Sequence, residues 1–307
     1  MHKKIMAALL AVLMILTFTI PAIAAKPVII PRQIELEGGD TPLLFSYKPR
    51  EHRLTVENKI PQSSDSIMME KLEVFPFLSQ DKNIADIQLA LYSNWANDGL
   101  LFFTLGDAVR SGRIHHLTIH GYNADRETSY TSYFDFVRTP DGHLDSCRPV
   151  GGDASFQCQI FYDLAGKIRL IQERNIQGQI ISYNLYYGKD KKLKTVNISA
   201  SARRSSLIPS IELARISLTR DALGNLIRTE IIPVDDEGND YNASALHSRN
   251  IHVFEYDPVS HELVRSVQQV DRGGNRIRTM NTYNIHHGAD GSISELEYAY
   301  RYEYQTI

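Results

Sequence analysis

A turn signature recurs through the second half of the chain, and it limits the folds that this sequence can adopt. Each copy joins an Asp to a Gly and lies between two apolar, strand-like runs. Asp can fold back on its own backbone, and Gly accepts a positive φ angle at little cost, so such groups turn a chain between strands. The repeat therefore predicts β-hairpins. The copies are Asp163-Leu-Ala-Gly166-Lys-Ile168, Asp221-Ala-Leu-Gly224-Asn-Leu226 and Asp271-Arg-Gly-Gly274-Asn-Arg-Ile277.

Strand-like runs and turn signals alternate from Leu100 to the last residue. Their regular spacing suits a meander of antiparallel strands, in which each strand is reached by a short loop. A polar stretch over 199–206 interrupts the alternation and is a candidate seam between two sheets. The turn signals lie near Gly106, Gly121, Gly142, Gly166, Gly178, Asp190, Gly224, Gly238, Ser260, Gly274 and Gly291.

The part of the chain before this alternation has a mixed composition. Short β-prone runs over 26–60 predict one or two opening hairpins. One helix is predicted before Pro76. A second is predicted over 83–97, although the run 87–91 also alternates as a strand would. The residues at helical spacing in this second segment are Ile84, Ile87, Leu91 and Trp95.

These patterns together predict a mainly β fold. We expect an antiparallel meander of repeated hairpins over 113–307, preceded by a mixed β/α segment over 25–112 with one or two short helices near 65–97. The hairpins would form a large twisted sheet, a sandwich or an open half-barrel. The spacing of the turns does not distinguish these three arrangements, because it does not encode the order of the strands.

The N-terminus has the features of a secretory signal peptide. Two lysines precede an apolar stretch over 5–20, and Ala22 and Ala24 supply the small side chains expected before cleavage after Ala24. An uncleaved anchor helix is the alternative, but the stretch is short for a membrane span. We therefore predict an exported protein, periplasmic or secreted, that is not an integral membrane protein after cleavage of residues 1–24.

The net charge excludes one class of partner. Cleavage removes two lysines and no acidic residue, so the formal charge of −3 becomes −5. Nucleic-acid binding requires a basic surface that contacts phosphates. The sequence therefore predicts no nucleic-acid partner.

Two cysteines, Cys147 and Cys158, lie in the exported part of the chain, where disulfides form. The segment between them contains Pro149 and two successive glycines, as a loop would. We expect a disulfide that pins this loop and stabilises the fold by about 2–3 kcal/mol. A redox-active pair is the alternative, although the spacing is not that of a CxxC motif.

In three segments, at 161–168, 219–228 and 254–257, a Tyr-Asp or related pair leads into a turn, and these segments resemble the tyrosine-aspartate (YD) or Rhs-type repeat of bacterial exported proteins. The resemblance covers residues 134–307, with departures at Thr219-Arg-Asp221 and at Ser260, where the turn glycine is missing. It implies β-hairpins that wind into sheets, and it implies no activity and no catalytic residue. The matching segments are Phe161-Tyr-Asp-Leu-Ala-Gly-Lys-Ile168, Thr219-Arg-Asp-Ala-Leu-Gly-Asn-Leu-Ile-Arg228, Phe254-Glu-Tyr-Asp257 and Leu263-Val-Arg265.

A histidine-rich run over 113–120 is the first candidate site. On a strand, His116 and His120 share one face across Thr118 and lie about 7 Å apart. A metal site needs a third ligand, for which His143 or the pair at 286–287 is available. The alternative is a polar strand face, with the apolar residues between the histidines turned to the core.

A tyrosine stripe near the C-terminus is the second candidate. Strict alternation over 295–304 indicates a strand with one buried and one wet face. Tyr packs its ring while its hydroxyl stays near water, so the stripe is either sheet packing or a platform for a glycan, a peptide or another chain. The candidate binding residues are Tyr298, Tyr300, Tyr302 and Tyr304.

No motif for a nucleophile, a phosphate-binding loop or a zinc-binding helix is present in the sequence. We therefore predict a non-enzymatic protein without a cofactor, with a binding or scaffolding role at the bacterial cell envelope and an envelope protein or a glycan as partner. The alternatives are a carrier or chaperone for an apolar ligand such as a lipid, and a metal-dependent hydrolase centred on His116 and His120. The sequence does not indicate an oligomeric state.

Overall fold

The computed structural model describes twelve stretches of the chain. The predicted signal peptide, the first predicted helix and most of the candidate seam lie outside them. No helix within these stretches is long and apolar enough to cross a membrane. The stretches are residues 27–36, 42–62, 82–92, 106–123, 127–150, 157–174, 179–201, 210–235, 237–244, 246–274, 276–297 and 300–307.

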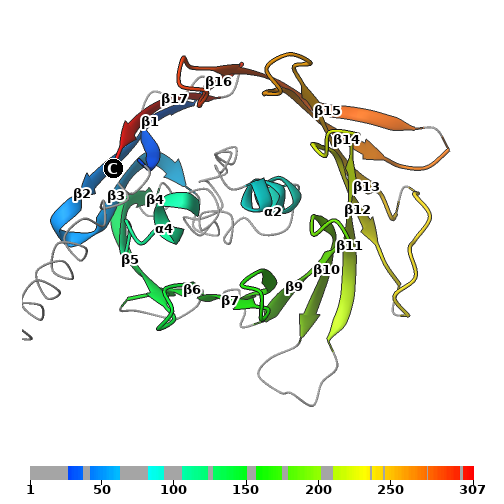
Figure 1. The fold of residues 1–307 in the computed structure, drawn as a ribbon, viewed down its shortest axis with the longest axis horizontal. Helices are drawn as coiled ribbons and strands as arrows, with labels where there is room; N and C mark the ends of the chain where they lie inside the picture. Colours follow the sequence, from blue (N-terminus) through cyan, green and yellow to red (C-terminus); the bar gives the residue numbers. More distant parts are fainter. Residues whose placement is uncertain are drawn as a thin grey trace, which may run out of the picture.

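The described strands form one closed sheet of 17 strands, drawn as a ring in Figure 1. Each strand pairs with its neighbours in the sequence, as the meander predicts. The strands are β1 (Ile29–Leu36), β2 (Leu43–Lys48), β3 (Arg53–Gln62), β4 (His116–Asn123), β5 (Thr128–Arg138), β6 (Leu144–Pro149), β7 (Gln157–Tyr162), β8 (Ile168–Arg174), β9 (Ile180–Tyr187), β10 (Leu193–Ser201), β11 (Ile211–Arg220), β12 (Leu226–Pro233), β13 (Arg249–Tyr256), β14 (Leu263–Asp271), β15 (Ile277–His287), β16 (Ile293–Leu296) and β17 (Tyr300–Thr306).

Closure of the sheet corrects the predicted open sheet, sandwich or half-barrel. β1 pairs with β17 from Ile29↔Thr306 to Leu36↔Tyr300, and it also pairs with β2. Pairing the first strand with the last satisfies backbone groups that an open sheet would expose at its two edges. Strands of the predicted mixed segment and of the hairpin region thus lie in the same barrel.

One pair of neighbouring strands, β3 and β4, is parallel, whereas the others are antiparallel. A parallel pair needs a long crossover connection, and here the connection carries both described α-helices. These are α2 (Lys82–Tyr92) and α4 (Gly106–Arg110), and both lie inside the ring in Figure 1. The described helices of the crossover therefore occupy the interior of the barrel rather than covering its outside.

The interior of the barrel is the hydrophobic core. Apolar side chains that point inward from the strands pack against α2, whose Ile84, Ile87 and Ala90 are buried. The predicted helical spacing is thus confirmed for Ile84, Ile87 and Leu91, whereas Trp95 lies outside the described residues. Burial of these side chains on both the helix and the wall holds the helix in place.

An ion pair joins the internal helix to the barrel wall. The guanidinium of Arg220 at the end of β11 donates to both carboxylate oxygens of Asp86, at 3.0 and 2.8 Å. It also donates to the carbonyls of Leu193 and Gly224 at 3.1 and 3.2 Å. The side chains of Arg220 and Asp86 are only 13% and 14% exposed. The pair therefore fixes α2, near its middle, to the wall beside two neighbouring turns.

Six of the described turns share one hydrogen-bond pattern. The N–H of the first residue donates to the C=O of the fifth, the N–H of the fourth donates to the C=O of the first, and the fourth residue has a positive φ angle. This is a type I turn followed by a one-residue bulge, which favours Gly at the fourth position. All three copies of the Asp-to-Gly signature join antiparallel strands, as predicted, and two of them have this turn pattern. The six turns span 139–143, 163–167, 188–192, 221–225, 235–239 and 288–292.

The third copy of the signature turns the chain in another way. The chain between β14 and β15 turns with Gly273 and Gly274 both at positive φ, and Arg272 N donates to Arg276 O at 3.3 Å. A Cβ atom on Gly273 would lie 1.9 Å from the carbonyl oxygen of Ala243. Glycine is therefore required there by close backbone approach as well as by φ.

Tyrosines at the ends of three strands repeat one further contact. Each hydroxyl donates to the carbonyl of the first residue of the preceding strand, beside a turn at the same end of the barrel. Burial raises the pKa of Tyr162 to about 12, so its hydroxyl remains a donor at neutral pH. The bonds run from Tyr162 to Leu144 (2.8 Å), from Tyr187 to Ile168 (2.7 Å) and from Tyr256 to Leu226 (3.0 Å).

Two glycines predicted as turn signals do not lie in turns themselves, although the chain does reverse direction after Asn123, near Gly121. Gly121 lies within β4, where a Cβ atom would come within 2.3 Å of the ring of Tyr130, so this glycine makes room for a cross-strand tyrosine. Gly106 begins α4 instead of a turn. The side chain of Arg138 on β5 bonds the carbonyls of Val109 and Arg110 at the end of this short helix. A cap from a distant strand leaves no local signal in the sequence.

The predicted disulfide is absent. Cys147 on β6 and Cys158 on β7 are direct partners in the sheet, and both are buried free thiols. Burial raises the pKa of the Cys147 thiol to about 12 and that of Cys158 well above its usual value. As free, buried thiols the two cysteines pack as small apolar core residues and do not staple the loop.

The turn aspartates predict a dependence of stability on pH. Asp257 accepts hydrogen bonds from Ser260 N and Val259 N at 2.7 and 2.8 Å, and these bonds lower its pKa below the usual value of 3.8. Its carboxylate therefore stabilises the fold above about pH 4, and this contribution is lost as the pH falls through the lowered pKa.

Replacing Asp257 by Asn tests this dependence. The melting temperature of Asp257→Asn should lie below that of the unaltered protein at neutral pH, and the difference should shrink as the pH falls below about 4. Thermal unfolding followed by circular dichroism from about pH 6 to about pH 2 measures both proteins. A difference that is the same at every pH would contradict this role for the carboxylate.

Candidate binding groove on the outer face

The outer face of β2 to β5 carries a regular array of polar side chains. The strand register sets them in rows across the sheet, because residues that are paired on neighbouring strands point to the same side. The first row contains Lys48, Arg53, His116 and Asp135, the second Ser46, Thr55, Thr118 and Tyr133, and the third Leu44, Glu57, His120 and Thr131.

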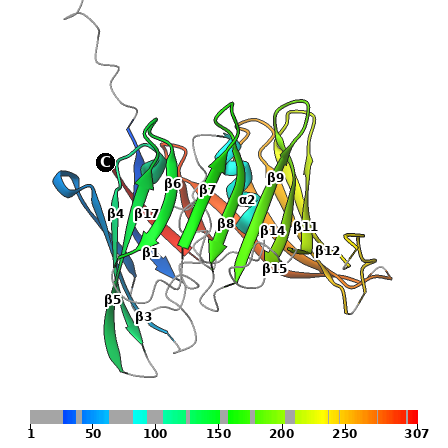
Figure 2. The ribbon, with the colours of Figure 1, turned by 90° about the horizontal axis from the view of Figure 1, so that it is seen from below.

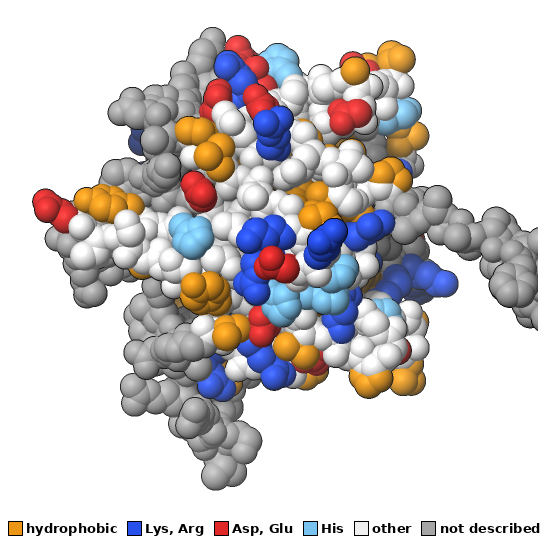
Figure 3. Space-filling view, turned by 90° about the vertical axis from the view of Figure 1, so that its left-hand side faces the viewer, with side chains coloured by type: hydrophobic (Ala, Val, Ile, Leu, Met, Phe, Trp, Pro, Cys, Tyr) orange, Lys and Arg blue, Asp and Glu red, His pale blue; other side chains and the backbone are white. Residues whose placement is uncertain are grey.

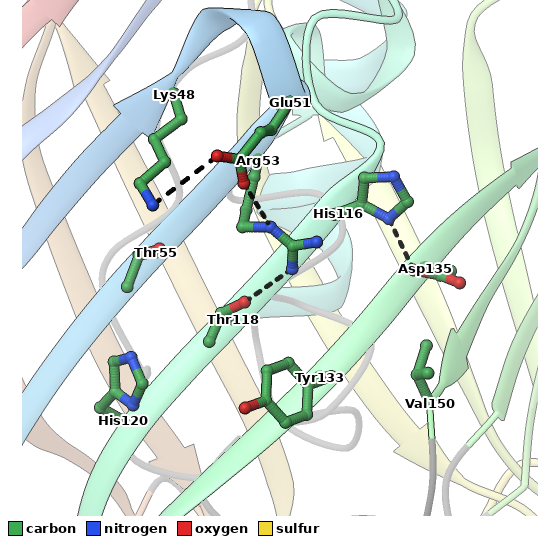
Figure 4. Close-up of a pocket in the computed structure, with 10 residues that line it drawn as sticks. All are labelled: Lys48, Glu51, Arg53, Thr55, His116, Thr118, His120, Tyr133, Asp135 and Val150. Carbon is green, nitrogen blue, oxygen red and sulfur yellow. Dashed lines mark hydrogen bonds and ion pairs between the residues drawn. The ribbon is translucent and has the colours of Figure 1, made fainter.

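Two depressions lie side by side on this face, and we call them together the outer groove. The first has a volume of about 550 Å³ and the second about 420 Å³, and both include His120. Figure 3 shows Lys, Arg and His side chains gathered on this side of the barrel. The first depression, drawn in Figure 4, is lined by Lys48, Glu51, Arg53, Thr55, His116, Thr118, His120, Tyr133, Asp135 and Val150.

Arg53 is the central cation of the outer groove. Its Nε lies 3.2 Å from Glu51 Oε2, and its guanidinium donates to Thr118 Oγ1 at 3.0 Å. Lys48 Nζ lies 3.8 Å from the other oxygen of Glu51. These contacts orient the guanidinium along the floor, as Figure 4 shows, while about a third of the side chain remains exposed. Arg53 can therefore donate further hydrogen bonds to a ligand.

The two predicted histidines lie on the same outward face, as the strand pattern requires. His116 Nδ1 lies 2.7 Å from Asp135 Oδ1, and His120 Nδ1 lies 2.9 Å from Thr131 Oγ1. The described part of the chain contains no group of three His, Cys, Asp or Glu side chains arranged to hold a metal ion. His143 lies on a turn beside Asp141, and His287 bonds the carbonyls of Gly291 and Leu263, so neither is seen beside the histidine pair.

Aromatic surface is supplied by Tyr133 on β5. This side chain is 46% exposed and stands over the first depression, facing Thr118. A half-exposed ring beside hydroxyl, guanidinium and imidazole groups can stack on an apolar ligand face while the polar groups bind its edges. The outer groove is thus suited to a ligand with many hydroxyl groups.

The described tyrosines of the stripe, Tyr302 and Tyr304, lie on the opposite, inner face of the sheet. Tyr302 is 5% exposed, and Tyr304 packs against the core, with the two rings 6.2 Å apart. Burial raises the pKa of Tyr304. Tyr298 and the side chain of Tyr300 lie outside the described residues. The two described tyrosines thus face the barrel interior, as the packing interpretation expects.

Sequence reasoning found the histidines of the outer groove but missed Arg53 and Tyr133. The alternation of β3 does indicate that Arg53 faces outward, since polar residues at 53, 55 and 57 alternate with buried Leu54 and Val56. Only the parallel pairing of β3 with β4 brings Arg53 beside His116, and that pairing is not visible in the sequence.

No protein-family model and no curated protein matches the chain. A solved structure that is similar to part of it is the TcdB2-TccC3-Cdc42 complex, at 12% sequence identity and a TM-score of 0.21. The match covers 52% of this chain and 10% of that one, so the chain spans about a tenth of its length. A structural similarity with so low a TM-score supports no conclusion about the fold or the function of this chain.

Proposed function

We propose that the protein is an exported, non-enzymatic binding or scaffolding protein of the bacterial cell envelope, with the outer groove as its ligand site. The observation that carries this proposal is the groove itself, an exposed tyrosine beside a fixed guanidinium on the wall of a closed barrel. The features of residues 1–24 support export. A wall of paired strands positions the binding side chains with little freedom, as a recognition surface requires.

The chemistry of the outer groove favours a glycan as the ligand. Arg53, Glu57 and His120 supply donors and acceptors along a floor of threonine hydroxyls. Tyr133 can stack on the apolar face of a sugar ring. The groove contains cations and carboxylates in mixed order, so it is suited to a polar ligand rather than to a strongly charged one.

Replacing Tyr133 by Ala should weaken glycan binding by about tenfold, because the stacking surface is lost. The measurement is titration calorimetry of the mature chain from Ala25 with soluble oligosaccharides prepared from bacterial peptidoglycan and lipopolysaccharide. The matched control is Tyr186→Ala on β9, since Tyr186 is 48% exposed and lies outside the groove. Equal affinities for the two variants would reject the groove as the site.

The non-enzymatic part of the proposal has its own test. The mature chain is incubated with panels of glycosidic, ester and phosphoester substrates, and no turnover is expected. Turnover that is lost in Arg53→Gln would identify the outer groove as an active site and would overturn the proposal.

A carrier of an apolar ligand is the second candidate. It is supported by a cavity of about 150 Å³ between α2 and the end of the barrel, with Ile84 and Ile87 in its lining. This volume is well below the roughly 300 Å³ at which ligand pockets begin, which makes the carrier the weaker proposal. Mass spectrometry of solvent extracts from the purified protein would favour it by detecting a stoichiometric lipid.

A further inference from the structure

The strand β15 has an open edge along most of its length. On one side it pairs with β14 from Ile277 to Asn284. On the other side only residues 285–287 pair, with β16. Within the described part of the chain, no strand pairs with the second edge of residues 277–283. A row of backbone donors and acceptors is therefore available to a further strand.

This edge projects from the barrel. Figures 1 and 2 both show the ends of β14 and β15 extending away from the ring of strands. All six residues over 277–282 are exposed, so both faces of this part of β15 are accessible. Ile277 and Met280 are 54% and 51% exposed. An incoming strand would thus meet no steric barrier from described residues and would cover apolar surface.

The projecting hairpin is also basic. It carries Arg272, Arg276 and Arg278, and none of them forms an ion pair with a described residue. Arg276 donates only to the carbonyl of Gly273 within the turn. The nearest acid in the sequence, Asp271, accepts a hydrogen bond from Gly273 N at 2.8 Å. Three unpaired cations on a chain of net charge −3 favour a partner of opposite charge.

We propose that the open edge of β15 is a docking site for an extended acidic segment of a partner protein, which adds to the barrel as a further strand. Main-chain hydrogen bonds to residues 277–283 would supply affinity, and the three arginines would select acidic side chains. A second copy of this chain fits less well, because pairing two β15 edges would bring like charges together. This inference does not depend on the glycan proposal, since the site lies on another part of the barrel.

The experiment uses two synthetic ten-residue peptides, one of alternating Glu and Val and one of alternating Lys and Val, each with a fluorescent label. Fluorescence anisotropy should show binding of the mature chain to the acidic peptide and about tenfold weaker binding to the basic one. Hydrogen exchange should slow at residues 277–283 when the acidic peptide is added. Equal affinities, or slowed exchange elsewhere and not at 277–283, would overturn the proposal.

Charge reversal identifies the residues that select the peptide. Arg276→Glu/Arg278→Glu should lose about tenfold in affinity for the acidic peptide. The control, Arg169→Glu/Lys194→Glu, makes the same change in net charge at exposed positions of β8 and β10. It should bind as the unaltered protein does, and an equal loss would show that only net charge matters.

Self-association is tested in the same protein. If residues 277–283 become protected with rising protein concentration in the absence of peptide, the occupant is a second copy and the proposal is wrong. Sedimentation equilibrium should instead show no association through this edge. An acidic peptide with Pro at its centre provides a further check, because it cannot pair as a strand and should bind weakly.

Discussion

Replacing Arg220 by Ala should lower the free energy of unfolding by about 3 kcal/mol, because the substitution leaves the carboxylate of Asp86 without its cation in a largely buried place. The guanidinium also holds the carbonyls of Leu193 and Gly224, so two turns lose a donor at the same time. The measurement is unfolding in urea followed by circular dichroism. Asp86→Ala should destabilise by a similar amount, since it removes the other half of the pair.

The control for this prediction is an exposed pair in the same barrel. Arg215 lies 2.8 Å from Asp240, and these side chains are 30% and 42% exposed. Arg215→Ala should therefore cost less than about 1 kcal/mol. A double-mutant cycle between Arg220 and Asp86 should show strong coupling. If the two substitutions were simply additive, the pair would not be what holds α2 to the wall.

Replacing Tyr302 by Ala should destabilise the protein by about 3–4 kcal/mol, the cost typical of removing a buried aromatic ring. Tyr302 is 5% exposed and belongs to the core on the closing strand β17. Loss of its ring would create a cavity beside the pairing of β17 with β1. Urea unfolding measures the loss, and Tyr302→Phe should retain most of the stability because the ring is kept.

Comparison with Tyr186→Ala separates burial from residue type, since Tyr186 is 48% exposed and should contribute little. Sheet packing and a recognition surface, the two interpretations of the tyrosine stripe, predict different stabilities for Tyr302→Ala. Unchanged stability with reduced partner binding would make the stripe a recognition surface. Because Tyr302 is buried, we instead expect Tyr302→Ala to lose stability.

The sequence predicted features that depend on neighbouring residues. The turns at 163–167 and 221–225 follow from an Asp and a Gly at fixed spacing, and α2 follows from apolar residues at helical spacing. Closure of the barrel was not predictable in this way, because it depends on β1 meeting β17. The hydrogen bond from Gln305 to Pro31 joins residues 274 positions apart.

The residues of the candidate site also fall into two groups, those that local sequence predicts and those that only the fold brings together. His116 and His120 were found because two residues on one strand share a face by local geometry alone. Arg53 joins them from the far side of a crossover, and Tyr133 joins from the next hairpin. The cysteine prediction was wrong because it rested on predicted export and on loop composition, and neither determines whether two facing thiols are bonded.

The parallel pair β3 and β4 has a consequence for how this molecule is assembled. The two described helices of the crossover lie inside the ring, so the apolar wall has to close around them. The wall is complete only when β17, the last of the described strands, has paired with β1. Until then the apolar inner wall is open to solvent, and contacts between distant strands form slowly. A chain in which β17 has not yet paired with β1 is thus the aggregation-prone form of this protein, and the pairing of this seven-residue strand ends that risk.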